Sequence, residues 1–316
     1  MIKLTVLDGH ALNPGDLSWK PLHDIADVTV YERTPPELAA ERIADSAAIL
    51  LNKVRIDEKI LSKCPNLRYI GVLATGYNVI DLDAAAAHGI TVTNIPSYST
   101  DAVAQHVFAL ITYFTNSVAL HAESVRKGGW TKSPDFCYWE RPLTELAGKT
   151  LGVLGFGHIG KKVCAIGEAF GMRTIFHTRT PPAASDAESV PFDELFSRSD
   201  FLSLHVPLSA ATERIVNART LSLMKPSAIL INTARGGCVD EKELAAALNC
   251  GRIAGYAADV STEEPMDGNS PLLHAENCII TPHIAWAPLE TRKRLLGIAA
   301  DNLKSWLAGT AKNTIY

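Results

Sequence analysis

A glycine motif placed between an apolar run and a helix-forming segment constrains the fold of this chain more than any other feature. The run Thr150–Leu154 has the composition of a buried strand, and glycines follow it at positions 155, 157 and 160, in the spacing G-x-G-x-x-G. A helix is expected over residues 161–170. In that setting the first glycine makes a tight turn, the second lets the backbone approach a pyrophosphate, and the third lets the helix pack on the strand. A glycine-rich turn without a ligand is the alternative; the position between strand and helix favours a dinucleotide-binding fold.

Short apolar runs alternate with helix-like segments on both sides of this motif. The expected strands are residues 2–7, 28–31, 47–51, 69–72 and 91–92 before it, and 174–177, 201–205, 228–232, 255–260 and 278–281 after it. Expected helices include residues 36–44, 81–88 and 289–308, and one long helix from Asp101 to Lys127, capped by Ser99 and Thr100 and closed by Gly128 and Gly129. This alternation predicts parallel sheets wound with helices. A length of 316 residues is long for one core and indicates two domains.

The composition excludes several classes of protein. A net charge of −4 comes without the basic run that nucleic acid or an anionic membrane surface requires. The six cysteines are scattered without metal-binding spacing, so no metal is expected. No apolar stretch reaches the length of a membrane span, and Met1–Leu7 resembles a first strand rather than a secretory signal. A cytoplasmic protein is expected.

Three polar side chains follow apolar runs and stand beside turn residues, where the ligands of open α/β sheets bind. Arg235 precedes two glycines, Glu264 precedes Pro265, and His283 follows Pro282. An arginine can grip a carboxylate with two parallel hydrogen bonds. A histidine held by a carboxylate can pass a proton at neutral pH. Together with a hydride carrier, this set predicts reduction of a 2-keto acid or oxidation of a 2-hydroxy acid.

Each of these residues also has a purely structural interpretation. Arg235 can cap a helix or pair with Asp240, and a lone histidine is more often a packed or surface residue. Glu263 is as acidic as its neighbour Glu264, so composition does not choose between them as partner of the histidine, and both can belong to a solvated loop. Asp259 ends an apolar run, where it can set the electrostatics near a nicotinamide or cap the next turn.

Taken together, the motifs resemble the D-isomer-specific 2-hydroxyacid dehydrogenase family, and most of all its glycerate dehydrogenase (hydroxypyruvate reductase) branch. The matching segments, in the family's order, are Gly155–Gly160, Leu204–Leu208, Asn232–Gly236, Asp259–Pro265 and Pro282–Trp286. The resemblance covers essentially the whole chain and implies an α/β homodimer whose subunit has two Rossmann- or flavodoxin-like doubly wound parallel-sheet domains. It implies a discontinuous substrate-binding domain of residues 1–98 and 286–316, a dinucleotide-binding domain of residues 99–285, and the active cleft between them.

The same resemblance implies a role for each candidate residue. Arg235 orients the substrate and polarises its keto oxygen, His283 is the acid–base residue, and Glu264, directly before proline as in the family pattern, tunes it. The backbone amides of Ala74, Thr75 and Gly76 are expected to receive the substrate carboxylate, with a plain strand–helix turn as the alternative. The expected cofactor-binding residues are Gly155, Gly157, His158, Ile159, Gly160, His177, Thr178, Arg179, His205, Val206, Pro207, Thr212, Thr233, Ala234, Arg235, Asp259, His283 and Ala285.

The first strand after the motif, which is the second strand of the dinucleotide-binding unit, bears on the choice between NAD(H) and NADP(H). Dinucleotide folds selective for NAD carry an acid at the end of this strand, about 20 residues beyond the motif. Here that position holds His177, and Arg179 can pair with a 2′-phosphate. We therefore expect NAD(P)H as cofactor, with a slight preference for NADPH. The alternative is that Arg179 stacks on the adenine and does not discriminate between the two cofactors.

Two segments depart from the simplest family pattern. Gln105 stands where the family more often has a glutamate, a change without an evident consequence. Residues Trp130–Trp139 are rich in aromatic side chains, and the resemblance implies a loop near the dimer interface, packed there or, through Phe136 or Trp139, touching substrate.

The leading functional hypothesis is a reductase of hydroxypyruvate and glyoxylate. A nicotinamide-sensing binding protein of corepressor type is the rival from another class. A related dehydrogenase acting on phosphite is a third. The formate branch is disfavoured because it has an amide where this chain has Glu264.

Overall fold

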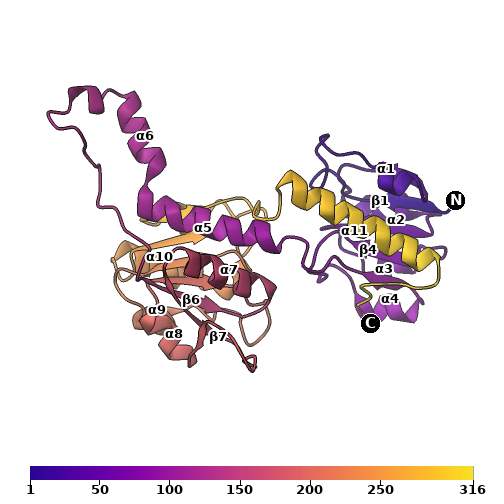
Figure 1. Ribbon diagram of the computed structural model, residues 1–316. Helices are drawn as coiled ribbons and strands as arrows, with labels where there is room; N and C mark the ends of the chain where they lie inside the picture. The colour runs from indigo at the N-terminus through magenta and orange to yellow at the C-terminus, as the bar shows by residue number, and fades with distance from the viewer. Residues whose placement is uncertain (316) are drawn as a thin grey trace. The chain divides into compact units, whose positions relative to one another are not determined.

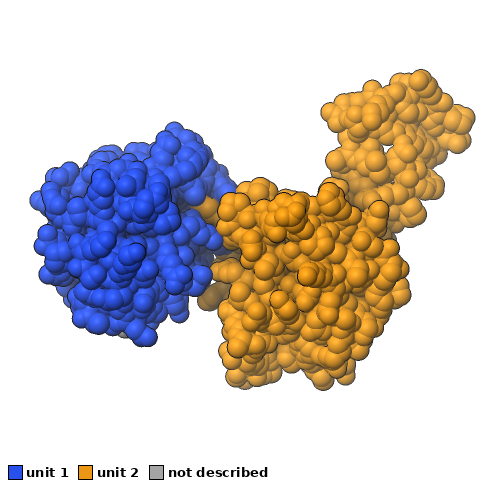
Figure 2. Space-filling view, turned by 180° about the vertical axis from the view of Figure 1, so that it is seen from behind, with its two compact units in different colours: residues 1–99, 287–316 blue, residues 100–286 orange. Residues whose placement is uncertain are grey.

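The computed structural model describes residues 1–315 and divides into two compact units (Figure 2). Unit 1 holds Met1–Ser99 and the segment from Ala287 on, and unit 2 holds Thr100–Trp286. These bounds lie one residue from those expected for the two domains. The assignment of substrate binding to unit 1 stays a prediction.

Unit 1 is built on a five-stranded parallel sheet in the order β2-β1-β3-β4-β5. Its strands are β1 (Lys3–Val6), β2 (Asp27–Val30), β3 (Ala48–Leu51), β4 (Tyr69–Val72) and β5 (Thr91–Thr93). Every residue of β3 and β4 is buried, as expected of central parallel strands covered on both faces. The order is that of the flavodoxin-like doubly wound fold.

Short helices and one long C-terminal helix cover this sheet (Figure 1). They are α1 (Lys20–His23), η1 (Pro36–Leu38), α2 (Ala39–Ile43), α3 (Glu58–Leu61), α4 (Leu82–Ala87) and α11 (Leu289–Leu307). Asp57 and Asp81 cap α3 and α4 by accepting hydrogen bonds from backbone amides of the first turn. The helix α11 returns to the sheet, where the Trp306 and Tyr69 ring centroids lie 5.0 Å apart.

Unit 2 is built on a seven-stranded parallel sheet in the order β12-β11-β10-β9-β6-β7-β8. Its strands are β6 (Thr150–Leu154), β7 (Arg173–His177), β8 (Glu188–Ser189), β9 (Phe201–Leu204), β10 (Ile229–Asn232), β11 (Gly255–Ala258) and β12 (Cys278–Ile280). The order reverses at β6, whose neighbours are β7 and β9. Ligands of open α/β sheets bind at such a switch point, outside the carboxyl ends of the strands.

Alternation of side chains along these strands produces two cores, one on each face of the sheet. Leu202, Leu204 and Leu230 point into the first core, whereas Phe201 and Ile231 point into the second. The helices of unit 2 are α5 (Thr100–Asn116), α6 (Val118–Arg126), η2 (Trp130–Lys132), α7 (His158–Ala169), α8 (Phe192–Arg198), α9 (Ala218–Leu223), η3 (Gly236–Cys238), α10 (Glu241–Asn249) and η4 (Pro271–His274). The two doubly wound parallel sheets confirm the predicted fold class.

The expectation of one helix from Asp101 to Lys127 was wrong. The helix breaks at Ser117, which has φ +50°, and α5 and α6 meet there at a bend of 53°. The break is held by side chains: the Ser117 Oγ accepts a hydrogen bond from Arg141 Nε at 2.6 Å, and its carbonyl accepts one from His121 Nδ1 at 2.9 Å. Residues other than glycine rarely adopt positive φ, so the local sequence around Ser117 does not predict this turn.

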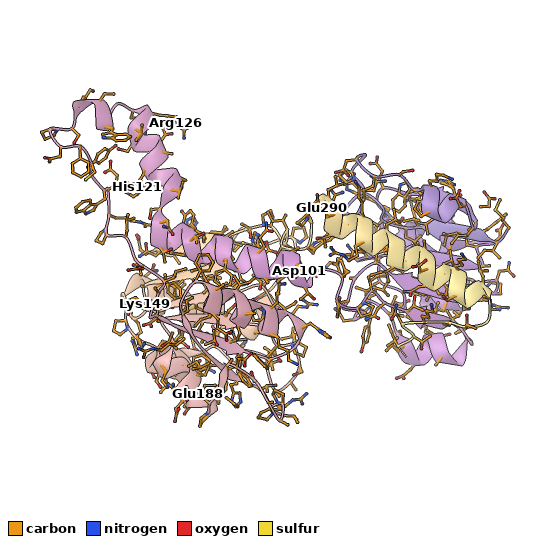
Figure 3. The ribbon with its side chains drawn as sticks, viewed as in Figure 1. Asp101, His121, Arg126, Lys149, Glu188 and Glu290 are labelled. Carbon is orange, nitrogen blue, oxygen red and sulfur yellow. The ribbon has the colours of Figure 1, made fainter. Side chains whose placement is uncertain are left out.

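Beyond the break, residues 118–145 form an arm in which no side chain is buried. The helix α6 and the returning loop contact each other, with Ser124 Oγ and Tyr138 Oη 2.9 Å apart. Figure 3 shows His121 and Arg126 on α6, away from the sheet of unit 2. The arm therefore stands apart from both cores of its own unit.

Within the described residues no single helix has the length and hydropathy to cross a bilayer. Only the bent pair α5 and α6 meets that test, by length and composition alone.

Candidate active site

The glycine motif lies at the switch point of the unit 2 sheet, between β6 and its two neighbours. Gly155 has φ +97°, and a Cβ there would lie 2.5 Å from the carbonyl oxygen of His205. Its amide donates to the carbonyl of His177 at 2.9 Å. The turn thus draws together the ends of β6, β7 and β9, and only glycine fits at its first position.

The third glycine lets α7 pack directly against the turn. A Cβ on Gly160 would lie 2.2 Å from the carbonyl oxygen of Gly155. The helix begins at His158, three residues earlier than expected, with Gly157 as its N-cap. The last part of the motif is therefore itself the first helical turn.

The second glycine tests whether a dinucleotide fits this turn. A Cβ on Gly157 would meet no atom within 4 Å, and no side chain caps the helix that follows. Open space therefore lies in front of backbone amides at a helix N-terminus, where a pyrophosphate finds donors and a favourable dipole. The residues present fit the phosphates of a dinucleotide.

Gly157→Val tests this assignment. Gly157 has φ −80° and ψ −163°, which a β-branched residue tolerates, so the variant is expected to fold normally. Its side chain would enter the space of the pyrophosphate, and we expect the Kd for reduced cofactor, measured by tryptophan fluorescence quenching, to rise at least about tenfold. Gly297→Ala is the control, because its Cβ also meets nothing within 4 Å but lies in α11. Unchanged affinity in the valine variant would remove Gly157 from the binding site.

The end of β7 carries the residues expected to meet the adenosine. The His177 Nδ1 donates to the Val190 carbonyl at 2.9 Å, which fixes the orientation of the ring. Thr178 is half-buried and Arg179 is exposed. The Arg179 guanidinium makes no hydrogen bond or ion pair with any residue from 1 to 315, so it is available to a ligand.

The loop after β9 holds the next group of expected cofactor residues, His205, Val206 and Pro207. The His205 Nε2 lies 2.8 Å from the Ser203 hydroxyl, and burial lowers the pKa of His205 to about 3, so the ring is neutral at pH 7. The Thr212 hydroxyl donates to the Pro207 carbonyl at 2.5 Å and closes the loop. These contacts shape the loop beside the glycine turn.

Arg235, Asp259 and His283 follow the carboxyl ends of β10, β11 and β12, which are neighbours in the sheet. The parallel sheet therefore brings together residues that lie far apart in the sequence. The backbone of Gly236 also packs closely on the β11 loop, since a Cβ there would lie 2.0 Å from the carbonyl carbon of Ser261. The loop with Arg235 and the loop with Glu264 are in contact.

His283 is paired with Glu264. Its Nδ1 lies 2.9 and 2.8 Å from the two carboxylate oxygens, and each side chain is about one-third exposed (32% and 30%). Since a carboxylate only accepts, Nδ1 carries the proton and Nε2 is left for a ligand. Glu263 is exposed and makes no ion pair within residues 1–315. An exposed pair of this kind adds only about 0–1 kcal/mol to stability, so its importance lies in orienting the ring.

Asp259 holds the turn on which His283 sits. The buried carboxylate accepts hydrogen bonds from the Thr281 hydroxyl at 2.5 Å and from the amides of Ile284 and Ala285 at 2.9 and 2.7 Å. His283 has φ +54°, an uncommon conformation for a residue other than glycine. Asp259 is therefore the cap of this turn; its predicted proximity to the nicotinamide stays a prediction.

Arg235 is exposed at the end of β10. Its Nη1 donates to the Ala234 carbonyl at 2.6 Å, and it does not pair with Asp240, which caps α10 instead. The fully buried Asn232 shapes this turn: its Oδ1 accepts from the Ala234 amide and its Nδ2 donates to the Arg235 carbonyl. The sequence motif included Asn232 without giving it a role; the signal was a polar residue at the end of an apolar strand.

Thr233, between these residues, carries an unpartnered polar atom. Its Oγ1 is buried and is the one such side-chain atom without a hydrogen-bond partner in the described part of the chain. Buried polar groups are nearly always satisfied. An orphan hydroxyl beside Arg235 fits a site completed by a polar ligand group, such as the amide of a nicotinamide.

The expected carboxylate-binding loop lies in unit 1, after β4. The Thr75 hydroxyl donates to the Ile95 carbonyl at 2.8 Å, and the Ala74 carbonyl accepts from the Ile95 amide at 3.0 Å. Asn94 Nδ2 donates to the Thr75 carbonyl at 2.8 Å. These bonds fix the course of the loop through Ala74, Thr75 and Gly76, and its role stays a prediction.

Comparison with known proteins places the whole chain among enzymes of one kind. Residues 108–285 match the family model for the D-isomer specific 2-hydroxyacid dehydrogenase NAD binding domain. The chain is 43% identical to a hydroxypyruvate reductase of Blautia hydrogenotrophica (99% of each chain covered) and 38% identical to a glycerate dehydrogenase of Methylorubrum extorquens (99% of this chain, 98% of the other). It superposes on an NADPH-dependent glyoxylate/hydroxypyruvate reductase of Sinorhizobium meliloti with a TM-score of 0.86, at 30% identity over 100% of this chain and 98% of the other.

Proposed function

The chain belongs to the D-isomer-specific 2-hydroxyacid dehydrogenase family and is an NAD(P)-dependent oxidoreductase, and we propose that it reduces hydroxypyruvate and glyoxylate. The observation that carries this proposal is the His283–Glu264 pair, held on a turn capped by Asp259, at the strand end two places from that of Arg235. The names of the relatives support the choice of substrate.

The proposed chemistry divides between three side chains of unit 2. A bound reduced nicotinamide supplies the hydride that reaches the carbonyl carbon. The Nε2 of His283 gives its proton to the carbonyl oxygen, so that a ketone gains one hydride and one proton and becomes a hydroxyl group. Glu264 accepts the hydrogen bond from Nδ1 and so holds the ring in place. Arg235 grips the carboxylate and polarises the carbonyl oxygen.

An initial-rate assay tests the proposal. Hydroxypyruvate, glyoxylate and pyruvate are each offered with NADH and with NADPH, and loss of reduced-cofactor absorbance is followed. We expect rapid turnover of hydroxypyruvate and glyoxylate, with other small keto acids within about 10–200-fold, because a small apolar pocket separates close homologues no better. Tight cofactor binding without turnover of any keto acid would overturn the reductase and favour the corepressor-type sensor. In a separate assay with NAD+ or NADP+, formation of reduced cofactor from phosphite, without turnover of any keto acid, would favour the phosphite dehydrogenase.

For the cofactor we propose a preference for NADPH. No acid stands at the end of β7 to repel a 2′-phosphate, and the unpaired Arg179 guanidinium lies two residues beyond His177. The NADPH-dependent structural relative supports the same choice.

Arg179→Ala separates the two roles open to this arginine. If the guanidinium binds the 2′-phosphate, kcat/KM for NADPH falls about tenfold while that for NADH stays within about twofold, since one charge-assisted hydrogen bond is lost. If it only stacks on the adenine, both values fall together. Arg173→Ala, at the opposite end of β7, is the control and is expected to change neither value.

We also propose that the arm of residues 118–145 forms a homodimer interface. Phe136 and Trp139 are 89% and 65% exposed, and no residue of the arm is buried within the subunit. Exposed apolar patches of this kind mark interaction sites. A cytoplasmic location belongs to the proposal too, because the six cysteines are free thiols, as in a reducing compartment.

Replacing Phe136 and Trp139 with serine together is expected to raise the dimer Kd by at least about 100-fold, because each buried aromatic contributes about 1.5–3 kcal/mol and each counts twice in a symmetric dimer. Light scattering after size exclusion reads the result. Leu273→Ser, at an exposed apolar residue of η4 outside the arm, is the control. A wild-type protein that is monomeric at micromolar concentration would contradict the proposal.

A further inference from the structure

A histidine on α5 contacts the network that holds the turn of His283. The Nε2 of His106 lies 3.0 Å from the Thr281 hydroxyl and 3.5 Å from the Asp259 carboxylate. The side chain of His106 is 18% exposed and that of Asp259 is 2% exposed. Because both side chains are largely shielded from solvent, this contact is not a solvated surface interaction.

The direction of each hydrogen bond in this network follows from its donors and acceptors. The Thr281 hydroxyl has one proton, and at 2.5 Å it donates that proton to Asp259. It must then accept from His106, so the Nε2 of His106 carries a proton. The chain of donors runs from His106 through Thr281 to Asp259, which also receives the amides of Ile284 and Ala285.

This chain ties the acid–base turn to the body of unit 2. The helix α5 packs on α7 and against β10 and β11, which makes it a rigid support. The turn itself is conformationally costly, because His283 has positive φ and needs anchors on both sides. Asp259 supplies one anchor directly, and His106 orients both Thr281 and Asp259.

We propose that His106 is a positioning residue for proton transfer by His283. The inference rests on the proposed reductase function and adds to it a residue that belongs to neither the expected substrate-binding nor the expected cofactor-binding set. Asp259 is the charged group in contact with His106; the next acid along α5, Asp101, pairs with Lys162 of α7 at 2.9 Å. His106 therefore acts through Thr281 and Asp259 on the backbone around His283.

The test compares His106→Leu with His106→Gln, whose amide nitrogen can take the place of Nε2. In the leucine variant we expect kcat for hydroxypyruvate to fall about tenfold with KM and cofactor Kd within about twofold, because small misplacement of a reacting group costs rate rather than binding. The glutamine variant is expected to recover most of kcat. Thr281→Val breaks the same chain at its second link and is expected to reproduce the leucine defect. His88→Leu removes a histidine from a carboxylate pair in unit 1 and is the control.

A second readout does not depend on turnover. Hydrogen exchange of the peptide containing Ile284 and Ala285 is expected to accelerate in His106→Leu and to return toward wild type in His106→Gln. If the wild-type protein reduces keto acids and His106→Leu matches it in both kcat and hydrogen exchange, the proposed role of His106 is overturned and the proposed function stands. A wild-type protein without keto-acid turnover would overturn the proposed function, and the exchange measurement would still decide whether His106 holds the turn.

Discussion

Replacing His283 with asparagine is expected to lower kcat for keto-acid reduction about 1,000-fold, within the 10²–10⁴-fold range of general acid–base catalysis. Asparagine is chosen because it keeps the backbone conformation: His283 has φ +54°, which asparagine tolerates better than most residues. The backbone bonds to Asp259 can then persist while the proton donor is lost. Steady-state rates at saturating cofactor and keto acid measure the effect.

The control for this variant is His274→Asn, which removes an exposed histidine of η4 in the same unit. It is expected to keep wild-type kcat. Cofactor Kd should stay within about threefold in both variants, because the phosphates are proposed to bind at the glycine turn, which neither variant changes. A kcat within tenfold of wild type in His283→Asn would show that another group moves the proton.

Arg235→Gln is expected to lower kcat/KM for hydroxypyruvate about 1,000-fold, because two charge-assisted hydrogen bonds to a carboxylate are lost together. Arg235→Lys keeps the charge but not the planar fork and should recover only part of the loss. Arg235 is exposed, and within residues 1–315 its side chain donates only to the Ala234 carbonyl, so the substitution should change the free energy of unfolding by no more than about 0.5 kcal/mol.

Arg214→Gln is the matched control, since it removes an exposed arginine of unit 2 that lies 3.8 Å from Asp240. Its kinetic constants should be those of wild type. If Arg235→Gln raised KM and left kcat unchanged, the guanidinium would bind substrate and transition state equally, and the proposed polarisation of the carbonyl would be wrong.

The sequence predicted those elements whose signal is local. The central strands of both sheets are short apolar runs, and they were placed to within one or two residues because a parallel strand buried on both faces needs such a run. The glycine motif was identified because its strand and helix are contiguous in sequence. Arg235, Glu264 and His283 were chosen as candidate site residues because each lies after an apolar run and beside a turn residue.

Features that depend on distant contacts were missed. The break at Ser117 is stabilised by Arg141, 24 residues away. The local sequence pattern does not contain this contact and therefore predicted an uninterrupted helix. Asn232 was included in a motif but given no role, since its two hydrogen bonds depend on how the turn before Arg235 folds back. His106, next to Gln105 in the sequence, was given no role, because its contact Thr281 is 175 residues away along the chain.

By itself, the sequence predicted the fold class, which the structure confirms, and it supplied the glycine motif and the candidate acid–base and carboxylate-binding side chains, whose roles stay predictions. The tertiary structure determines which residues these side chains contact. The order β12-β11-β10 sets the strand ends of His283, Asp259 and Arg235 side by side, and the pairing of His283 with Glu264 rather than Glu263 follows from the path of one loop. The physical reason is that strand runs and turns are encoded by neighbours in the chain, whereas hydrogen-bond partners are selected by which strand ends the sheet brings together.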